Sequence, residues 1–186
     1  MTPNSFVLKN TVSLVPLSAD HADNMYRWVC DPLVRENLGI RREPSLERTH
    51  AWIDQALQDD SVCAFAILNN GVHVGNVILD RIDRYLSTAR LSVYVGEENM
   101  RGSGLGRTGI YLALREAFDT LKLHKVWLTV HSRNTAAIHA YQRLGFQIEG
   151  VLRDEFILHD ERIAALYMGV LEEDFRQLNA VWTAGD

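Results

Sequence analysis

The sequence predicts a mixed α/β fold: a central, mostly antiparallel sheet with one strand-helix-strand crossover and helices on both faces. Three observations lead to this fold class. Apolar runs with strand-like character recur along the chain, and segments with apolar residues three and four positions apart, typical of amphipathic helices, lie between them. An Asn-Asn-Gly turn at residues 69–71 joins two of the apolar runs and indicates a hairpin. A long helical segment between two later strands indicates the crossover.

The first third of the chain predicts one strand followed by two helices. Residues 11–15 alternate between polar and apolar side chains, as a half-buried strand does. Ser18 is a suitable N-cap for a helix that ends before the Asp-Pro pair at residues 31–32. A short segment and a charged loop, residues 33–44, then lead to Ser45, which opens the second helix.

The remainder of the chain predicts strands, with two further helices among them. The expected elements are strands at 62–68, 72–79, 88–95 and 126–130, helices at 105–121 and 134–144, and closing strands at 146–150, 151–158 and 163–170. No internal repeat or Pro/Gly/Ser linker interrupts this order. We therefore expect a single domain over residues 1–186, with its core at about 12–170.

Composition and charge argue against several classes of protein. The net charge is −5, whereas broad nucleic-acid binding depends on Lys and Arg that neutralise phosphates. No stretch approaches the roughly 18 apolar residues that a membrane-spanning helix needs. The two cysteines, Cys30 and Cys63, have no second ligand at metal-binding spacing. We therefore expect buried free thiols, no metal site, no nucleic-acid or membrane partner, and a cytoplasmic location.

A glycine-rich loop at residues 101–108, Arg-Gly-Ser-Gly-Leu-Gly-Arg-Thr, precedes the long predicted helix. Glycines let a backbone approach a phosphate closely, and the unpaired N–H groups of a helix start attract anions. A flexible turn is the alternative interpretation, but arginines on both sides favour a phosphate site. Gly104, Gly106 and Gly109 also fit the dinucleotide fingerprint, yet the following strand ends without the carboxylate that would hold a ribose. A P-loop is excluded because Ile110, not Lys, follows Gly109.

A second motif combines Asn134 and Tyr141, which are seven residues apart on the predicted helix. This spacing is close to two turns, so both side chains share a face and are separated by roughly 10 Å of helix rise. Taken alone, Asn134 is an ordinary N-cap and Tyr141 an ordinary core aromatic residue. Together with the glycine loop, they indicate a site for one long phosphate-containing ligand.

These segments resemble the GNAT superfamily of acyl-CoA-dependent N-acetyltransferases. Arg101, Gly104 and Gly106 meet its Arg/Gln-x-x-Gly-x-Gly/Ala pyrophosphate motif, and Asn134, Tyr141 and the Gly-Phe pair at 145–146 meet its later motif. The resemblance spans nearly the whole chain, from Val12 to about Val170. It implies an acetyl-CoA-dependent transfer of an acetyl group to a primary amine.

The resemblance also implies roles for particular residues. Tyr141 would protonate the departing thiolate. The expected acetyl-CoA contacts are Tyr94, Val95, Gly96, Arg101, Gly102, Ser103, Gly104, Leu105, Gly106, Arg107 and Asn134. Of these, 94–96 would lie beside the pantetheine arm, where a bulge separates their strand from the one ending at Val130. Residues 102–107 would hold the pyrophosphate through their N–H groups.

The sequence identifies neither the residue that acts as general base nor the molecule that accepts the acetyl group. Several relatives place a glutamate where this chain has Thr129; the other candidates are His131, Asp80, Asp83 and Glu97. The acceptor is expected to be a small molecule or peptide, and the subgroup resembled acts on protein N-termini, polyamines and amino sugars. Acidic side chains could meet a cationic amine and basic ones a sugar nucleotide, although simple solvated charge explains both sets: Glu149, Asp154 and Glu155, and Arg35, Arg41 and Arg42.

The sequence also leaves open whether the protein is an enzyme and whether it forms a homodimer. A non-catalytic acyl-CoA-binding or sensing protein would keep the glycine loop and dispense with the chemistry. The absence of a glutamate at Thr129 favours that alternative, whereas the spacing of Asn134 and Tyr141 favours the enzyme. A homodimer is the form of self-association that we consider.

Overall fold

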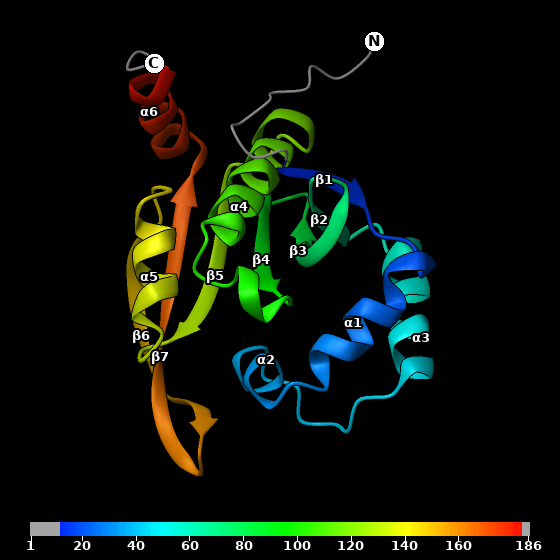
Figure 1. Ribbon diagram of the computed structural model, residues 1–186. Coiled ribbons are helices and arrows are strands. Elements are labelled where there is room, and N and C mark those ends of the chain that lie inside the picture. The colour runs from blue at the N-terminus through cyan, green and yellow to red at the C-terminus, as the bar shows by residue number, and fades with distance from the viewer. Residues whose placement is uncertain (1–11, 184–186) are drawn as a thin grey trace.

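The computed structural model describes residues 12–183, with side chains up to Leu178, and contains one seven-stranded sheet. The strand order is β1-β2-β3-β4-β5-β7-β6 (Figure 1). The strands are β1 Val12–Pro16, β2 Cys63–Asn69, β3 Val72–Asp83, β4 Thr88–Val95, β5 Lys125–His131, β6 Gln147–Leu158 and β7 Glu161–Leu171. Thr11, which the sequence analysis assigned to the first strand, lies outside the described residues.

Neighbouring strands are antiparallel except for β4 and β5, which are parallel. The connection between β4 and β5 is the long helix α4, so the crossover predicted from the sequence is present. The predicted fold class, a mostly antiparallel sheet with one strand-helix-strand unit, is confirmed.

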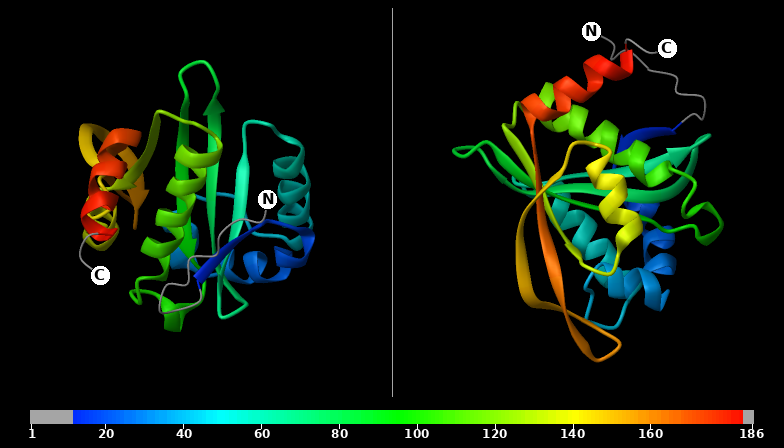
Figure 2. Two further views of the ribbon diagram at one scale, coloured as in Figure 1. Left: turned by 90° about the horizontal axis from the view of Figure 1, so that it is seen from above. Right: turned by 90° about the vertical axis from the view of Figure 1, so that its left-hand side faces the viewer.

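Helices cover both faces of the sheet (Figure 2). They are α1 Ala22–Val29, α2 Pro32–Asn37, α3 Leu46–Gln58, α4 Leu105–Arg115, α5 Thr135–Gln142 and α6 Glu172–Thr183. A smaller core under α1 and α3 includes Trp28, Ile53 and Ala66, while the larger core under α4 includes Val77 and Phe118. Within residues 12–183, no helix is long and apolar enough for a membrane span.

Local capping explains where the helices begin. Ser45 Oγ accepts the Arg48 N–H at 3.2 Å, and Asn134 Oδ1 accepts the Ala137 N–H at 3.1 Å. Each bond satisfies a first-turn donor that has no partner within its own helix. The Ser18 N–H donates to His21 Nδ1 at 3.0 Å, and α1 follows a short 3₁₀ turn from that point.

The C-terminal part differs from the sequence prediction in two ways. The two strands expected at 146–150 and 151–158 form the single strand β6, whose pairing with β7 is irregular between Ile148 and Gly150 and again between Leu152 and Phe156. Gly150 was interpreted as a strand end, but here it accompanies an irregularity inside a strand. The helix α6 was not expected, although Phe175, Leu178 and Val181 lie at helical spacing in its sequence. Phe175 is buried against Tyr111 and Phe118.

Gly109 is the position where α4 packs most closely against the sheet. A Cβ added at Gly109 would lie 2.7 Å from Ile67 Cδ1 on β2. This contact is too short, so a side chain here requires either that the Ile67 Cδ1 methyl moves aside or that the helix moves away from the strand. The glycine that completed the apparent dinucleotide fingerprint therefore serves helix-to-sheet packing.

The first prediction tests this close contact. Gly109→Ala is expected to lower the free energy of unfolding by about 1–3 kcal/mol, because the new methyl group overpacks the core. Ile67→Val removes the Cδ1 atom, so the double variant should lose less stability than the sum of the two single changes. Urea unfolding of all four proteins measures the coupling. Gly150→Ala is the control, since a Cβ there meets nothing within 4 Å; additive losses in the cycle would contradict the prediction.

Candidate active site

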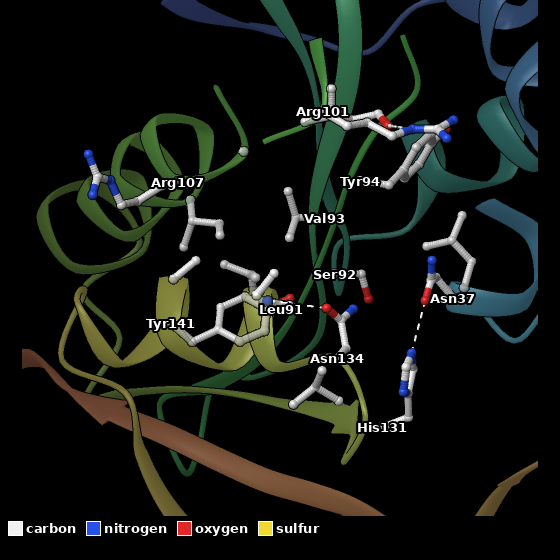
Figure 3. Close-up of a pocket in the computed structure, with 18 of the residues that line it drawn as sticks. Asn37, Leu91, Ser92, Val93, Tyr94, Arg101, Arg107, His131, Asn134 and Tyr141 are labelled. Carbon is white, nitrogen blue, oxygen red and sulfur yellow. Dashed lines mark hydrogen bonds between the residues drawn. The ribbon is translucent and has the colours of Figure 1, made fainter. Parts of the chain in front are cut away.

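The site lies where β4 and β5 part from each other. The two strands pair only over Thr88–Arg90 and Lys125–Trp127, and they diverge beyond those residues. A cavity of about 930 Å³ occupies the divergence, lined by β4, β5, the glycine loop, α2 and α5 (Figure 3). Figure 3 shows Arg107 and Tyr141 on one side of the β4 residues Leu91–Val93, and Asn37 and His131 on the other.

The expected bulge lies at the very end of β4. The β3–β4 register is unbroken from Gly75 opposite Val95 to Asp80 opposite Arg90. Just after β4, the N–H groups of Gly96 and Glu97 both donate to the Val74 carbonyl, at 2.9 and 3.3 Å. Two residues thus face one, as in a bulge. The separation of the strands begins well before this point, at Arg90.

The glycine loop has the backbone conformation that only glycine adopts readily. Gly102 and Gly104 have φ of +76° and +90°, and a Cβ on either would project into open space. Gly104 is the N-cap of α4, so the N–H groups of the residues after it stand in the first turn without intrahelical acceptors. Gly106 and Arg107 line the cavity at this point. The loop therefore presents an anion-binding helix start to the cavity.

Arg101 has a partner that the sequence did not reveal. Its guanidinium Nη2 donates to Asp31 Oδ2 at 2.6 Å and to the Gly96 carbonyl at 3.0 Å, and its Nε donates to the Val95 carbonyl at 3.3 Å. The charge of Arg101 is thus shared with a carboxylate, and the side chain ties the loop to the start of α2. Arg107 and Arg143 line the cavity as well.

Two of the expected acetyl-CoA contacts do not line the cavity. Leu105 is buried in the larger core, and a Cβ on Gly96 would collide with the Trp28 ring. Gly96 was expected to lie beside the pantetheine arm, but the side from which a Cβ would project is occupied by the Trp28 indole. The other expected contacts all line the cavity: Tyr94, Val95, Arg101, Gly102, Ser103, Gly104, Gly106, Arg107 and Asn134.

Tyr141 and Asn134 both line the cavity, as their shared helix face predicts. The Tyr141 ring packs against Phe146 with 5.7 Å between centroids, and burial raises the pKa of Tyr141 to about 12. The phenol therefore keeps its proton over the physiological range. The Asn134 Oδ1 atom accepts the hydrogen bond that caps the helix, so the amide nitrogen is the group that remains to contact a ligand.

Three of the four candidates for a general base are engaged elsewhere, and Thr129, at the position of the relatives' glutamate, cannot act as a base. Asp80 is held by Arg90, Glu97 accepts from Arg27 and Trp28, and Asp83 caps a turn by accepting the Tyr85 and Leu86 N–H groups; none of these three carboxylates lines the cavity. Thr129 and His131 do line it.

His131 is buried rather than on the surface, where a strand-end histidine usually lies. It is 8% exposed, and its Nε2 lies 2.9 Å from Asn37 Oδ1 on α2. Its Nδ1 is buried without a hydrogen-bond partner among the described residues. Burial lowers the pKa of His131, helped by the charge of Arg133, so the ring is neutral at pH 7. The contact with Asn37 joins residues 94 positions apart, which no local pattern could reveal.

The charged residues proposed to recognise an acceptor do not line the cavity. Glu149 forms an ion pair with Lys125 at 2.6 Å, and Arg35 lies 3.5 Å from Glu43. Asp154 and Glu155 are exposed on β6, as are Arg41 and Arg42 in the loop before α3. Within the described part of the chain, no group of three His, Cys, Asp or Glu could hold a metal ion.

Comparison with known proteins identifies the family. Residues 11–147 match the family described as the acetyltransferase (GNAT) domain. The chain therefore belongs to the GNAT acetyltransferases, as its two motifs predicted.

The sequence identity between this chain and individual relatives is low. The chain is 30% identical to the spermidine N(1)-acetyltransferase of Escherichia coli K12, over 66% of this chain and 65% of that protein. It thus spans slightly less than two thirds of that relative. It is 27% identical to the alpha/beta-tubulin-N-acetyltransferase 9 of Drosophila melanogaster, over 78% and 80% of the two chains. A spermidine N-acetyltransferase from Vibrio cholerae, solved with CoA and spermine, has the same fold, with a TM-score of 0.84, 22% identity, and 89% and 98% coverage.

The second prediction concerns the two buried histidines. Burial lowers the pKa values of His73 and His131, so between each folded pKa and the unfolded value of about 6.5 the unfolded chain binds more protons. The contribution of each histidine to the free energy of unfolding is therefore fully present above the unfolded pKa of about 6.5, and it is lost as the pH falls toward the folded pKa. We expect a lower Tm at pH 5.5 than at pH 7.5 in calorimetry. His73→Gln and His131→Gln should each reduce the difference between the two pH values, and a pH-independent Tm would contradict the assignment.

Proposed function

We propose that this chain transfers an acetyl group from acetyl-CoA to a primary amine. The observation that carries the proposal is the convergence of three features on one cavity. An anion-binding loop, a protonated phenol and two diverging strand edges all border the same space. Such a cavity suits a long donor with a phosphate end and a reactive thioester end.

The donor would lie from the glycine loop toward Tyr141. Backbone N–H groups at the start of α4 would hold the pyrophosphate, and Arg107 would add positive charge. Because β4 and β5 no longer pair beyond Arg90, their facing backbone groups are available to the amides of the pantetheine arm. The Asn134 amide nitrogen would donate to the same arm.

The reaction would be a direct transfer. The amine nitrogen forms a bond to the acetyl carbon, the carbon–sulfur bond breaks, the nitrogen loses a proton and the sulfur gains one. Tyr141 would donate a hydrogen bond to the departing sulfur. A phenol with a pKa of about 12 is a weak acid, so it stabilises the developing thiolate without losing its own proton early.

A non-catalytic acyl-CoA-binding protein is the second candidate, because within the described residues no carboxylate base lines the cavity. Release of free thiol from acetyl-CoA in the presence of a primary amine separates the two. The expectation that both cysteines are buried is wrong, because Cys30 is exposed and Cys63 is partly buried. Both thiols are free, which supports a reducing location such as the cytoplasm. A homodimer stays part of the proposal; the solved V. cholerae relative includes a dodecameric form.

The third prediction tests the donor loop. Acetyl-CoA should raise the Tm of the parent protein and NAD should not, since only a ligand that binds the folded state stabilises it. Gly104→Val should abolish the acetyl-CoA shift, because the side chain would occupy the open space beside the first turn. Gly106→Val should act in the same direction.

Gly71→Val is the matched control for strain. Gly71 also has positive φ, +78°, with open space around its Cβ, but it lies in the β2–β3 turn away from the cavity. This variant should lose similar stability and still bind acetyl-CoA. Normal acetyl-CoA binding by both Gly104→Val and Gly106→Val would show that the loop does not hold the pyrophosphate.

The fourth prediction is that Tyr141→Phe lowers turnover more than acetyl-CoA affinity. The ring still packs on Phe146, whereas the proton donor is lost, so single-turnover acetylation should slow roughly 10²- to 10⁴-fold. Tyr111→Phe is the control, since Tyr111 packs against Phe175 outside the cavity. Unchanged single-turnover rates in Tyr141→Phe across pH would leave Tyr141 with a packing role only.

A further inference from the structure

We infer that the acceptor is a primary amine carried on an uncharged, apolar body, and that polyamines are poor acceptors. The inference rests on the proposed function and concerns the end of the cavity beside α2. We call this end the acceptor end. It is lined by Leu33, Val34, Asn37, Leu38, His131 and Phe156.

The acceptor end is apolar with two neutral polar groups. Leu33, Val34 and Leu38 come from α2 and the residue after it, and Phe156 comes from β6. The polar groups, the Asn37 amide and the His131 ring, are bonded to each other. Since burial keeps the His131 ring neutral at pH 7, neither group supplies a charge to a ligand.

Among the described residues, no aspartate or glutamate lines any part of the cavity. Two carboxylates beside its walls are paired with arginines: Asp31 with Arg101 and Asp80 with Arg90, each at 2.6 Å. Glu36, next to Asn37 on α2, lies 3.7 Å from His159 Nε2, and Glu155, next to Phe156, is exposed; neither lines the cavity. A carboxylate that is hydrogen-bonded to a guanidinium has little remaining attraction for a second cation. The charged side chains that do line the cavity are arginines: Arg90, Arg101, Arg107 and Arg143.

A polyamine carries further ammonium groups beside the one that reacts. Moving such a group from water into a space without a counter-charge is unfavourable. An apolar body has the opposite preference, because its transfer to Leu, Val and Phe side chains is favourable. The chain therefore differs in selectivity from relatives that are named for spermidine.

The test compares two acceptors that differ by one charge. Hexylamine and 1,6-diaminohexane have the same carbon chain, but only the diamine carries a second ammonium group. With acetyl-CoA saturating, kcat/KM per reactive amine should be at least about tenfold higher for hexylamine, and spermidine should behave like the diamine. Equal or better use of the diamine or of spermidine would overturn the inference.

A charge-insertion variant provides a second measurement. Leu33→Glu places a carboxylate at the rim of the acceptor end, where the side chain is 52% exposed and tolerates the change. It should raise kcat/KM for the diamine several-fold relative to hexylamine. Leu86→Glu is the control, since Leu86 is 60% exposed in the β3–β4 turn. An unchanged ratio in Leu33→Glu would contradict the inference.

Failure of the proposed function is distinguishable from failure of this inference. If none of the amines releases thiol from bound acetyl-CoA, the proposed function fails. Selectivity is then decided by melting the CoA-loaded protein with each amine. A larger increase in Tm from hexylamine supports an apolar acceptor end, whereas an equal or larger increase from the diamine overturns it.

Discussion

The separation of β4 from β5 is the constraint on which the site depends. Each strand keeps a full partner on its outer edge, because β4 pairs with β3 as far as Val95 and β5 pairs with β7 as far as His131. Their inner edges pair with each other only as far as Arg90 and Trp127. Beyond that point the backbone groups on the inner edges have no strand partner across the gap, and the Val95 carbonyl accepts from Arg101 instead. The position of the cavity thus follows from the sheet topology, and the side chains that line it determine its shape and polarity.

The same topology brings two helix starts to the cavity. β4 and β5 are parallel, and each is followed by a helix, so α4 and α5 begin at the same end of the diverging pair. Their N-caps are Gly104 and Asn134, which both line the cavity. Gly104 leaves its first turn open to an anion, whereas the Asn134 side chain closes part of its own. The starts of α4 and α5 therefore differ in what they can bind.

Local patterns predicted the elements and the two motifs, because strand alternation, caps and glycine conformations are properties of neighbouring residues. What they could not predict depends on contacts between distant residues. Arg101 was expected beside a phosphate, yet its guanidinium is bound to Asp31, 70 positions away. The Leu105 side chain packs in the core, and His131 is buried among contacts that include Asn37 on α2 and Phe156 on β6. Irregular pairing hid the continuity of β6, whereas α6 could have been predicted, because Phe175, Leu178 and Val181 lie at helical spacing.

The Asp31 carboxylate joins two parts of the cavity wall. One oxygen accepts the Leu33 N–H at 2.9 Å and caps α2, and the other accepts from Arg101, which in turn holds the Gly96 carbonyl. A six-residue helix is not stable by itself, so α2 depends on tertiary contacts, which include the Asp31–Arg101 pair, the buried Val34 and the Asn37–His131 bond. The glycine loop and the cap of α2 thus share one carboxylate, and a ligand that moved the Arg101 side chain would also change a contact at the start of α2. Any such coupling would act equally in both directions, because linkage between binding sites is reciprocal.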